Sequence, residues 1–327
     1  MNREKSSERA QRRGAVSFGG SWDLLRLLVI ACGFGLGSSH AQIPRPPLEA
    51  SAAFAGATRH HYTAADGRTP LRLYVFAPTV ERGGGARAGI VFFHGSGWVE
   101  GWVEQFSAYA RALAAVGVVA VCADYRTQKS HGATPFDAAG DARAAVRWLR
   151  MHAAELGLDP RRLAAAGASS GAHIALCAAV FPDVAGEMIS ARPDALVLFS
   201  AVTDTTVEGY PAGVPLLGGR ERELSPRHHL AAGLPPMRLL HGDADAWVPV
   251  ASARRFATEA AALGNRAELV VFAARGHAFF NHAEYRPGVR PDDFFTCLFL
   301  TEQFLAGLGW IKPPAGIGSA PLEKSTS

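Results

Sequence analysis

The chain has 327 residues, of which 48% are hydrophobic and 19% charged, enough for one large domain with a buried core and too few for a second. Its formal net charge is +4, but residues 1–41 hold six basic and three acidic residues, so the remainder carries only +1. This balance gives nucleic-acid binding no support from composition.

The first 41 residues predict a signal peptide. Basic residues up to Arg13 precede an apolar stretch over Leu24–Leu36, and Ser39–Ala41 provides a small-x-small cleavage site. The apolar stretch is shorter than the about 20 residues that a membrane span needs. We therefore expect a periplasmic or secreted mature protein with no stable membrane span. Lipid anchoring at Cys32 is the disfavoured alternative, because the apolar run before this cysteine is very short.

The rest of the chain is expected to form one folded domain between two less ordered segments. Residues 42–58 contain three prolines and predict a linker, residues 59–312 the domain, and residues 313–327 a disordered tail. The domain is expected to begin with two antiparallel strands over residues 59–78, joined by a turn at Asp66-Gly67.

Strands and helices are then expected to alternate. Apolar runs predict buried strands, and periodic segments between them predict helices. The strands are Ala88–Phe93, Val118–Cys122, Arg162–Ala166, Ala195–Phe199, Pro236–Leu240 and Ala267–Phe272, and the helices are Gln105–Val116, Thr134 to Gly157, a segment after Pro249, and Asp292–Leu308. Such alternation predicts an α/β fold with a doubly wound, mostly parallel sheet. Residues 201–232 lose this periodicity, which predicts a short cap segment beside an open cleft.

A nucleophile elbow is the first chemical motif. The segment Gly167–Gly171 has the pattern G-x-S-x-G between a predicted strand and a predicted helix, with Ser169 at its tip. The backbone N–H of Ser170, at the start of the helix, is placed to bind an oxyanion. The pattern alone is weak, because 35 glycines make a chance match easy.

Partners for this serine occur in the expected order along the chain. The loop His94–Trp98 follows a predicted strand, and its Ser96 and Gly97 can turn backbone N–H groups toward one oxygen. Asp245 and His277 follow the last two predicted strands. Asp243, in the same loop as Asp245, and the more distant Asp204 are alternative acids, and His282 is an alternative base.

These motifs resemble the α/β-hydrolase superfamily, and within it small bacterial esterases of the hormone-sensitive-lipase-like and acetyl/feruloyl-esterase-like branches. The resemblance rests on the His94–Trp98 loop with Gly101, on Asp124–Arg126, on the elbow, and on the loops of Asp245 and His277, and it covers residues 59 to 308. Two departures are His-Gly-Ser-Gly in place of His-Gly-Gly-Gly, and Ser-Ser-Gly-Ala in place of Ser-Ala-Gly-Gly.

The resemblance implies hydrolysis of carboxylic esters through an acyl-enzyme. Ser169 would be the nucleophile, His277 the base and Asp245 the acid, which the family spacing favours over Asp243. It further implies short acyl groups, such as acetyl or feruloyl groups on carbohydrates, so the expected partner is a small-molecule or saccharide ester. No cofactor or metal is expected. A serine peptidase of the same fold and an inert binding protein are the alternatives.

Aromatic residues and other polar residues near these motifs leave choices open. Trp98 and Trp102 either line a substrate pocket or pack in the core. His94 is interpreted as a loop organiser, and Asp124–Arg126 as a support for the same loop.

The cysteines and the histidine pairs have simpler interpretations. Cys122, Cys177 and Cys297 are interpreted as buried thiols, although one disulfide among them stays open. The pairs His60-His61 and His228-His229 are interpreted as surface residues rather than metal ligands, since adjacent side chains diverge in strands.

Overall fold

The computed structural model describes residues 52–78, 85–95, 97–183 and 185–314 of the chain. The signal peptide, most of the linker, Ser96 and the tail beyond residue 314 lie outside these ranges. The predictions made for them are therefore not addressed by the structure.

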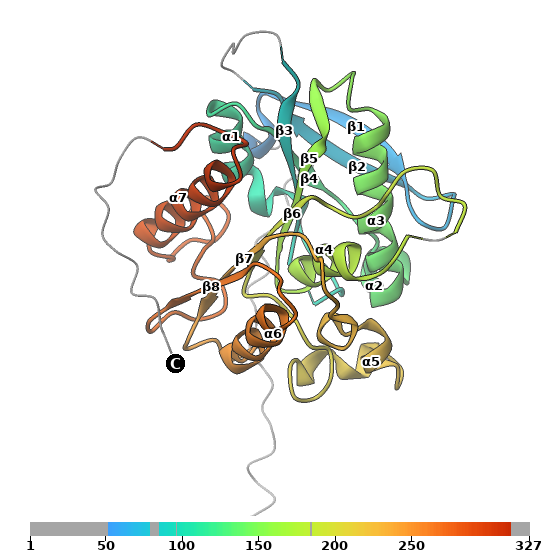
Figure 1. Ribbon diagram of the computed structural model, residues 1–327, viewed down its shortest axis with the longest axis vertical. Helices are drawn as coiled ribbons and strands as arrows, with labels where there is room; N and C mark the ends of the chain where they lie inside the picture. Colours follow the sequence, from blue (N-terminus) through green and yellow to red (C-terminus); the bar gives the residue numbers. More distant parts are fainter. Residues whose placement is uncertain (1–51, 79–84, 96, 184, 315–327) are drawn as a thin grey trace, which may run out of the picture. The chain divides into compact units, whose positions relative to one another are not determined.

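An eight-stranded sheet forms the centre of the domain, in the order β1-β2-β4-β3-β5-β6-β7-β8 (Figure 1). The strands are β1 (Ala57–Thr63), β2 (Pro70–Phe76), β3 (Arg87–Phe93), β4 (Val119–Ala123), β5 (Leu158–Ala168), β6 (Ala195–Phe199), β7 (Met237–Gly242) and β8 (Ala267–Phe272). β2 is antiparallel to β1 and β4, and every other pair is parallel. The predicted α/β fold with a mostly parallel sheet is confirmed.

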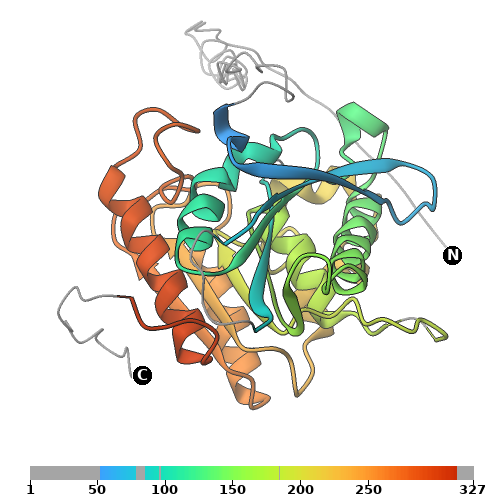
Figure 2. The same cartoon turned by 90° about the horizontal axis from the view of Figure 1, so that it is seen from above.

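Helices cover both faces of this sheet. α1 and α7 lie on one face and α3, α4 and α6 on the other, as the two views in Figures 1 and 2 show. Their bounds are α1 (Ser107–Ala115), α2 (Gln128–His131), α3 (Pro135–Met151), α4 (Ser170–Val180), α5 (Glu221–Leu224), α6 (Val250–Ala262) and α7 (Pro291–Gly307). Because both faces are covered, strands such as Ala195–Phe199 are buried at every residue.

The helix α3 begins as its sequence predicts and ends earlier. Thr134 caps it, with Pro135 at the first helical position, and a capping box joins Thr134 and Asp137 in both directions. The helix ends at Met151 rather than near Gly157. The residues between form turns, and Gly157 adopts a left-handed φ of 64° before β5 begins.

The folded domain starts earlier than residue 59. A 3-10 helix spans Ala52–Phe54, and Phe54 is buried with its ring stacked on Tyr74 of β2. The last residues of the predicted linker are thus part of the domain, because an aromatic side chain there packs on β2. The linker prediction over 42–58 was too long at this end.

The cap segment contains only short elements. Between β6 and β7 lie the 3-10 helices Pro211–Leu216 and Pro226–His229 and the single turn α5. None of the helices in the described part of the chain is long and apolar enough to cross a membrane.

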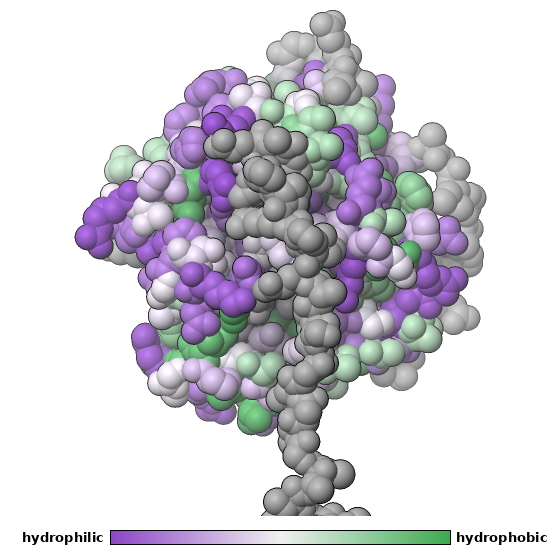
Figure 3. Space-filling view, turned by 180° about the vertical axis from the view of Figure 1, so that it is seen from behind, coloured by the Kyte–Doolittle hydropathy of each residue, from purple (hydrophilic) through white to green (hydrophobic). Residues whose placement is uncertain are grey.

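On the coloured part of the face drawn in Figure 3, hydrophilic and hydrophobic residues intermingle. Large exposed hydrophobic residues are single and scattered along the chain: Met151, Met188, Val207, Trp247, Leu263 and Phe295. Exposed hydrophobic residues of this kind are normal on monomeric proteins.

Candidate active site

The nucleophile elbow is a strained turn between β5 and α4. Ser169 has a φ of 52° and a ψ of −118°, a left-handed φ that few non-glycine residues adopt. Its backbone N–H donates to Phe199 O of the neighbouring strand at 2.9 Å, and its C=O accepts from His173 N at 3.0 Å. These bonds fix the turn on both sides of the serine.

Two glycines allow the elbow to pack this closely. A Cβ at Gly171 would collide with the carbonyl oxygens of Phe93, the last residue of β3, and of His94, the first residue after it. A Cβ at Gly167 would lie 2.5 Å from Gly171 C and 2.7 Å from Phe93 O. The two glycines of the motif are therefore required by backbone contact between the elbow and the predicted oxyanion loop.

The predicted oxyanion loop lies directly against this elbow. A Cβ at Gly95 would be 3.0 Å from Ala168 O, and Gly97 has a left-handed φ of 61°. Gly97 also faces the hydroxyl of Tyr210 from the cap segment, 3.3 Å from where its Cβ would be. The loop and the first turn of α4, which begins at Ser170, thus meet at the carboxyl end of the sheet.

A network of polar side chains supports the oxyanion loop. The Tyr125 hydroxyl donates to His94 O at 2.9 Å, and the two rings stack with centroids 4.3 Å apart. His94 Nε2 lies 3.8 Å from Asp124 Oδ1. Burial alone would raise the pKa of Asp124, but the His94 ring and the guanidinium of Arg72 outweigh it and lower the pKa below its usual value.

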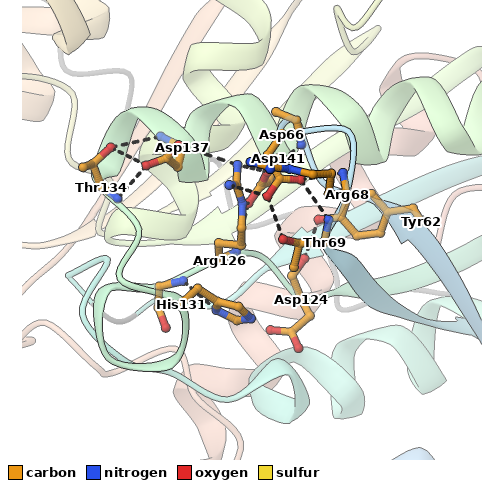
Figure 4. A network of polar contacts seen from close by, with 12 residues as sticks. Tyr62, Asp66, Arg68, Thr69, Asp124, Arg126, His131, Thr134, Asp137 and Asp141 are labelled. Atoms are coloured by element: carbon orange, nitrogen blue, oxygen red, sulfur yellow. Dashed lines mark hydrogen bonds and ion pairs between the residues drawn. The ribbon is translucent and has the colours of Figure 1, made fainter.

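The same network extends to the first hairpin and to α3 (Figure 4). The Arg126 guanidinium donates two hydrogen bonds to the fully buried Asp141, at 2.8 and 2.9 Å, and one to Asp66 at 3.0 Å. The Tyr62 hydroxyl donates to Asp124 O at 2.6 Å. Asp124–Arg126 therefore joins the oxyanion loop to the rest of the domain, as its interpretation as a support requires.

Asp245 and His277 meet across the loops that follow β7 and β8. Asp245 Oδ2 accepts from His277 Nδ1 at 2.7 Å, and Asp245 Oδ1 accepts from the backbone N–H groups of Trp247 and Val248, both at 2.9 Å. Burial alone would raise the pKa of Asp245, but hydrogen bonds from His241 and His277 outweigh it and hold the pKa well below its usual value. Asp245 is thus a carboxylate across the neutral pH range.

The alternative acids and base are engaged elsewhere. Asp243 Oδ1 accepts from Ala274 N at 2.6 Å and so joins the two loops. Asp204 is buried in the cap, where it accepts from Thr206 N at 2.9 Å and binds further cap residues. His282 Nδ1 lies 3.3 Å from Glu284 N. Of the candidate pairs, the structure brings together Asp245 and His277.

The two tryptophans have different environments. Trp98 is 1% exposed and packs edge-on against His173 and Tyr210, with ring centroids 5.0 and 5.6 Å away. Trp102 is half-buried, and its ring lies 6.4 Å from that of Tyr285. For Trp98 the geometry favours the packing alternative, because its ring has almost no accessible surface.

Two polar residues at the site were not predicted from the sequence. Gln105 Oε1 accepts from Gly95 N at 2.7 Å, while its amide donates to Asn281 Oδ1 at 2.9 Å, so it links the oxyanion loop to the loop of His277. His241 lies 3.3 Å from Asp245. The only signal for His241 was its position before Gly242, at the end of a predicted strand; for Gln105 there was none.

The histidine pairs form other contacts. His60, in β1, lies beside Trp148 with centroids 5.5 Å apart. His228 and His229 lie in a 3-10 helix, not in a strand, so the divergence argument was wrong for this pair. Their ring nitrogens contact Ser225 Oγ at 2.8 Å and the backbone O of Glu223 at 2.9 Å.

The thiols are buried, and the described residues form no metal site. The three cysteines of the described chain, Cys122, Cys177 and Cys297, are free and buried, and burial raises the pKa of each thiol. No group of three or more His, Cys, Asp or Glu residues within the described ranges could hold a metal ion.

A separate hollow lies at the other end of the strands. It has a volume of about 620 Å³ and is lined by residues near the starts of β5, β6 and β7, among them Arg161, Arg192 and Asp194. Ser169 follows the carboxyl end of β5. Ligands of open parallel sheets bind at the carboxyl ends, so this hollow is not the candidate active site.

Several known esterases are similar to this chain in sequence. The BD-FAE family model matches residues 74–205. Carboxylesterase NlhH of Mycobacterium tuberculosis is 40% identical over 125 residues, which are 37% of each chain. Isoprenylcysteine alpha-carbonyl methylesterase ICME of Arabidopsis thaliana is 27% identical over 231 residues, covering 63% of this chain and 53% of that protein. The matches thus span between a third and about half of the length of these relatives.

A solved structure matches over more of the chain. Esterase Est2 of Thermogutta terrifontis, with propionate bound, is 36% identical with a TM-score of 0.72, covering 80% of this chain and 98% of that one. The same esterase phosphonylated by sarin gives a TM-score of 0.73 at the same identity. Four fifths of this chain therefore share the fold of an esterase, and the chain belongs to the α/β-hydrolase superfamily, among its hormone-sensitive-lipase-like esterases.

Proposed function

We propose that the protein is an exported serine esterase that cleaves esters of short carboxylic acids through an acyl-enzyme. The observation that carries the proposal is the hydrogen bond between Asp245 and His277, at the same edge of the sheet as the strained elbow of Ser169. An esterase needs a nucleophile, a base and an oriented acid at one place, and these are the residues available there.

The proposed reaction begins with attack of Ser169 Oγ on the ester carbonyl carbon. His277 accepts the serine proton through Nε2 and passes it to the leaving alcohol, while Asp245 holds the Nδ1–H tautomer and stabilises the imidazolium. The N–H groups of Gly97 and Ser170, and of Ser96, donate to the oxyanion. Water, activated by the same histidine, then attacks the acyl-enzyme and releases the acid.

The acyl group is proposed to be short. Est2 of Thermogutta terrifontis has been solved with propionate and with butyrate bound, and in this chain the buried Tyr210, in contact with Trp98, places its hydroxyl beside Gly97. The resemblance to acetyl and feruloyl esterases extends the proposal to acyl groups of this kind on saccharides.

Release of p-nitrophenol from acetyl, butyryl and octanoyl esters tests this proposal. We expect kcat/KM to fall with chain length, and Ser169→Ala to lower kcat by about 10⁴- to 10⁶-fold. Ser190→Ala, on an exposed loop, is the matched control and should keep full activity. Equal activity of Ser169→Ala and the control would refute the serine mechanism. Preference for octanoyl esters would refute the short acyl group, and methyl ferulate against acetylated xylan would separate the two saccharide classes.

Export is a separate part of the proposal and rests on the sequence of residues 1–41. Expression of the full chain in a Gram-negative host, followed by osmotic shock, should release the protein shortened to begin near Gln42. A control chain with Arg26→Glu and Leu28→Glu in the apolar stretch should remain in the cytoplasm. Full-length protein in the cytoplasm from both chains would overturn the export proposal.

A further inference from the structure

A second histidine lies against the candidate acid. His241 is the penultimate residue of β7, pairs with Val271 of β8, and has a side chain that is 1% exposed. Its position at the carboxyl end of the strand puts it directly before the loop that carries Asp245. The proposed reaction gives this residue no part.

The ring nitrogen Nε2 of His241 faces two oxygens. It lies 2.8 Å from Val248 O and 3.3 Å from Asp245 Oδ2. Neither a backbone carbonyl nor a carboxylate can donate, so the hydrogen must be on Nε2 and is shared between the two acceptors. Asp245 Oδ2 is also the atom that accepts from His277 Nδ1.

The other ring nitrogen fixes the charge of His241. Within the part of the chain that the structure describes, Nδ1 is buried and has no hydrogen-bond partner. A second proton there would create a buried cationic N–H without an acceptor, which is costly. His241 is therefore neutral, with a bare Nδ1 and a protonated Nε2.

The carboxylate of Asp245 accepts three hydrogen bonds and has a fourth N–H group beside it. Oδ1 accepts from the backbone N–H groups of Trp247 and Val248, and Oδ2 accepts from His277 Nδ1. His241 Nε2 lies 3.3 Å from the same Oδ2. A polar N–H group at this distance favours the position of Oδ2 that the His277 hydrogen bond requires.

We infer that His241 is a positioning residue of the proposed esterase: as a neutral hydrogen-bond donor it aims Asp245 Oδ2 at His277. Its proposed effect on the reaction passes through Asp245. The inference rests on the proposed function for its kinetic consequence, but the 3.3 Å contact with Asp245 and the His277–Asp245 hydrogen bond are present in the resting protein.

Two variants separate the donor from the volume of the side chain. In His241→Gln, the terminal amide can donate from a position near Nε2, while His241→Leu has similar bulk and no donor. We expect His241→Leu to lower kcat about tenfold, the effect of losing one hydrogen bond to a charged group, with KM changed less than about twofold. His241→Gln should recover most of kcat. Equal losses in the two variants, with both folded, would overturn the inference.

A double-mutant cycle tests whether the effect passes through Asp245. His241 also bonds Val248 O, so His241→Leu could act by loosening the loop. If His241 acts through the carboxylate, His241→Leu should lower kcat by less than about twofold in an Asp245→Asn background. The same tenfold loss in both backgrounds would assign His241 to loop structure and overturn its positioning role.

Proton NMR supplies a test that needs no turnover. The His277–Asp245 hydrogen bond should give a low-field signal in the wild-type protein, shifted in His241→Leu and returned in His241→Gln. An unchanged signal in His241→Leu would overturn the inference. If the wild-type protein hydrolysed no ester, the proposed function would be refuted, but this spectroscopic test could still be carried out.

Discussion

The two halves of the candidate site are assembled in different ways. The elbow and the oxyanion loop are held by backbone shape, with glycines where a Cβ would strike a carbonyl oxygen. The acid and the base are held by hydrogen bonds across two loops, with Asp245 accepting from His277 and from two backbone N–H groups. The elbow and the oxyanion loop therefore have almost no room for an added atom. The acid and the base depend instead on charge and on the positions of hydrogen-bond donors.

The largest effect is expected from breaking the backbone half. Gly171→Ala puts a Cβ against the carbonyl oxygens of Phe93 and His94, which cannot move without displacing β3. We expect a loss of about 3 kcal/mol in the free energy of unfolding and loss of ester hydrolysis. Urea denaturation and p-nitrophenyl acetate hydrolysis measure both.

A glycine without close neighbours is the control for Gly171→Ala, because it separates the effect of the Cβ clash from that of replacing a glycine by alanine. Gly307 lies exposed at the end of α7, where a Cβ meets nothing closer than 3.7 Å. Gly307→Ala should be neutral or stabilising by up to about 1 kcal/mol. If Gly171→Ala were as stable and active as this control, the account of the elbow would be wrong.

The next effect tests the side-chain half. Asp245→Asn should lower kcat by about 10⁴-fold with the fold intact, because the amide disrupts the tautomer and charge that His277 needs. Asp243→Asn, in the same loop, should cost less than about tenfold, since Asp243 only accepts from Ala274 N. Steady-state kinetics of the two variants compare them directly, and the reverse order would reassign the acid.

A smaller effect is expected where the two halves are joined. Gln105→Leu removes the acceptor of Gly95 N and the donor to Asn281, so the oxyanion loop and the base loop lose their link. We expect kcat to fall about tenfold with little change in KM. Gln303→Leu, on the exposed side of α7, is the control and should leave kcat unchanged. Identical kinetics of the two variants would mean that the halves are positioned independently.

The smallest effect concerns acid stability. The pKa of Asp245 is lower in the folded protein than its ordinary value of 3.8, so its stabilisation is complete above that value and is lost as the pH falls toward the folded pKa. The free energy of unfolding should therefore decrease below about pH 4, and less steeply in Asp245→Asn. Urea denaturation between pH 6 and 3 measures this slope. Parallel slopes would show that Asp245 is not the residue whose pKa is lowered.

Local pattern was enough to predict the fold class and most elements. Thr134 and Pro135 predicted the start of α3, because capping depends on residues within one turn. Its end at Met151 was missed, since the apolar spacing continues into turns that pack on the sheet without being helical. The burial of Phe54 was also missed, because it depends on contact with Tyr74 from a strand later in the chain.

The sequence by itself determined the order of the strands and helices along the chain, the elbow at Ser169, and a short set of acids and bases after the last two strands. These are properties of local backbone chemistry, which a few neighbouring residues express. Only the tertiary structure showed the hydrogen bond between Asp245 and His277, the link that Gln105 forms between two loops, and the position of His241 at 3.3 Å from the acid. Hydrogen bonds between residues far apart in sequence depend on side-chain directions to within an ångström, and these are set by the packed sheet rather than by the residues themselves.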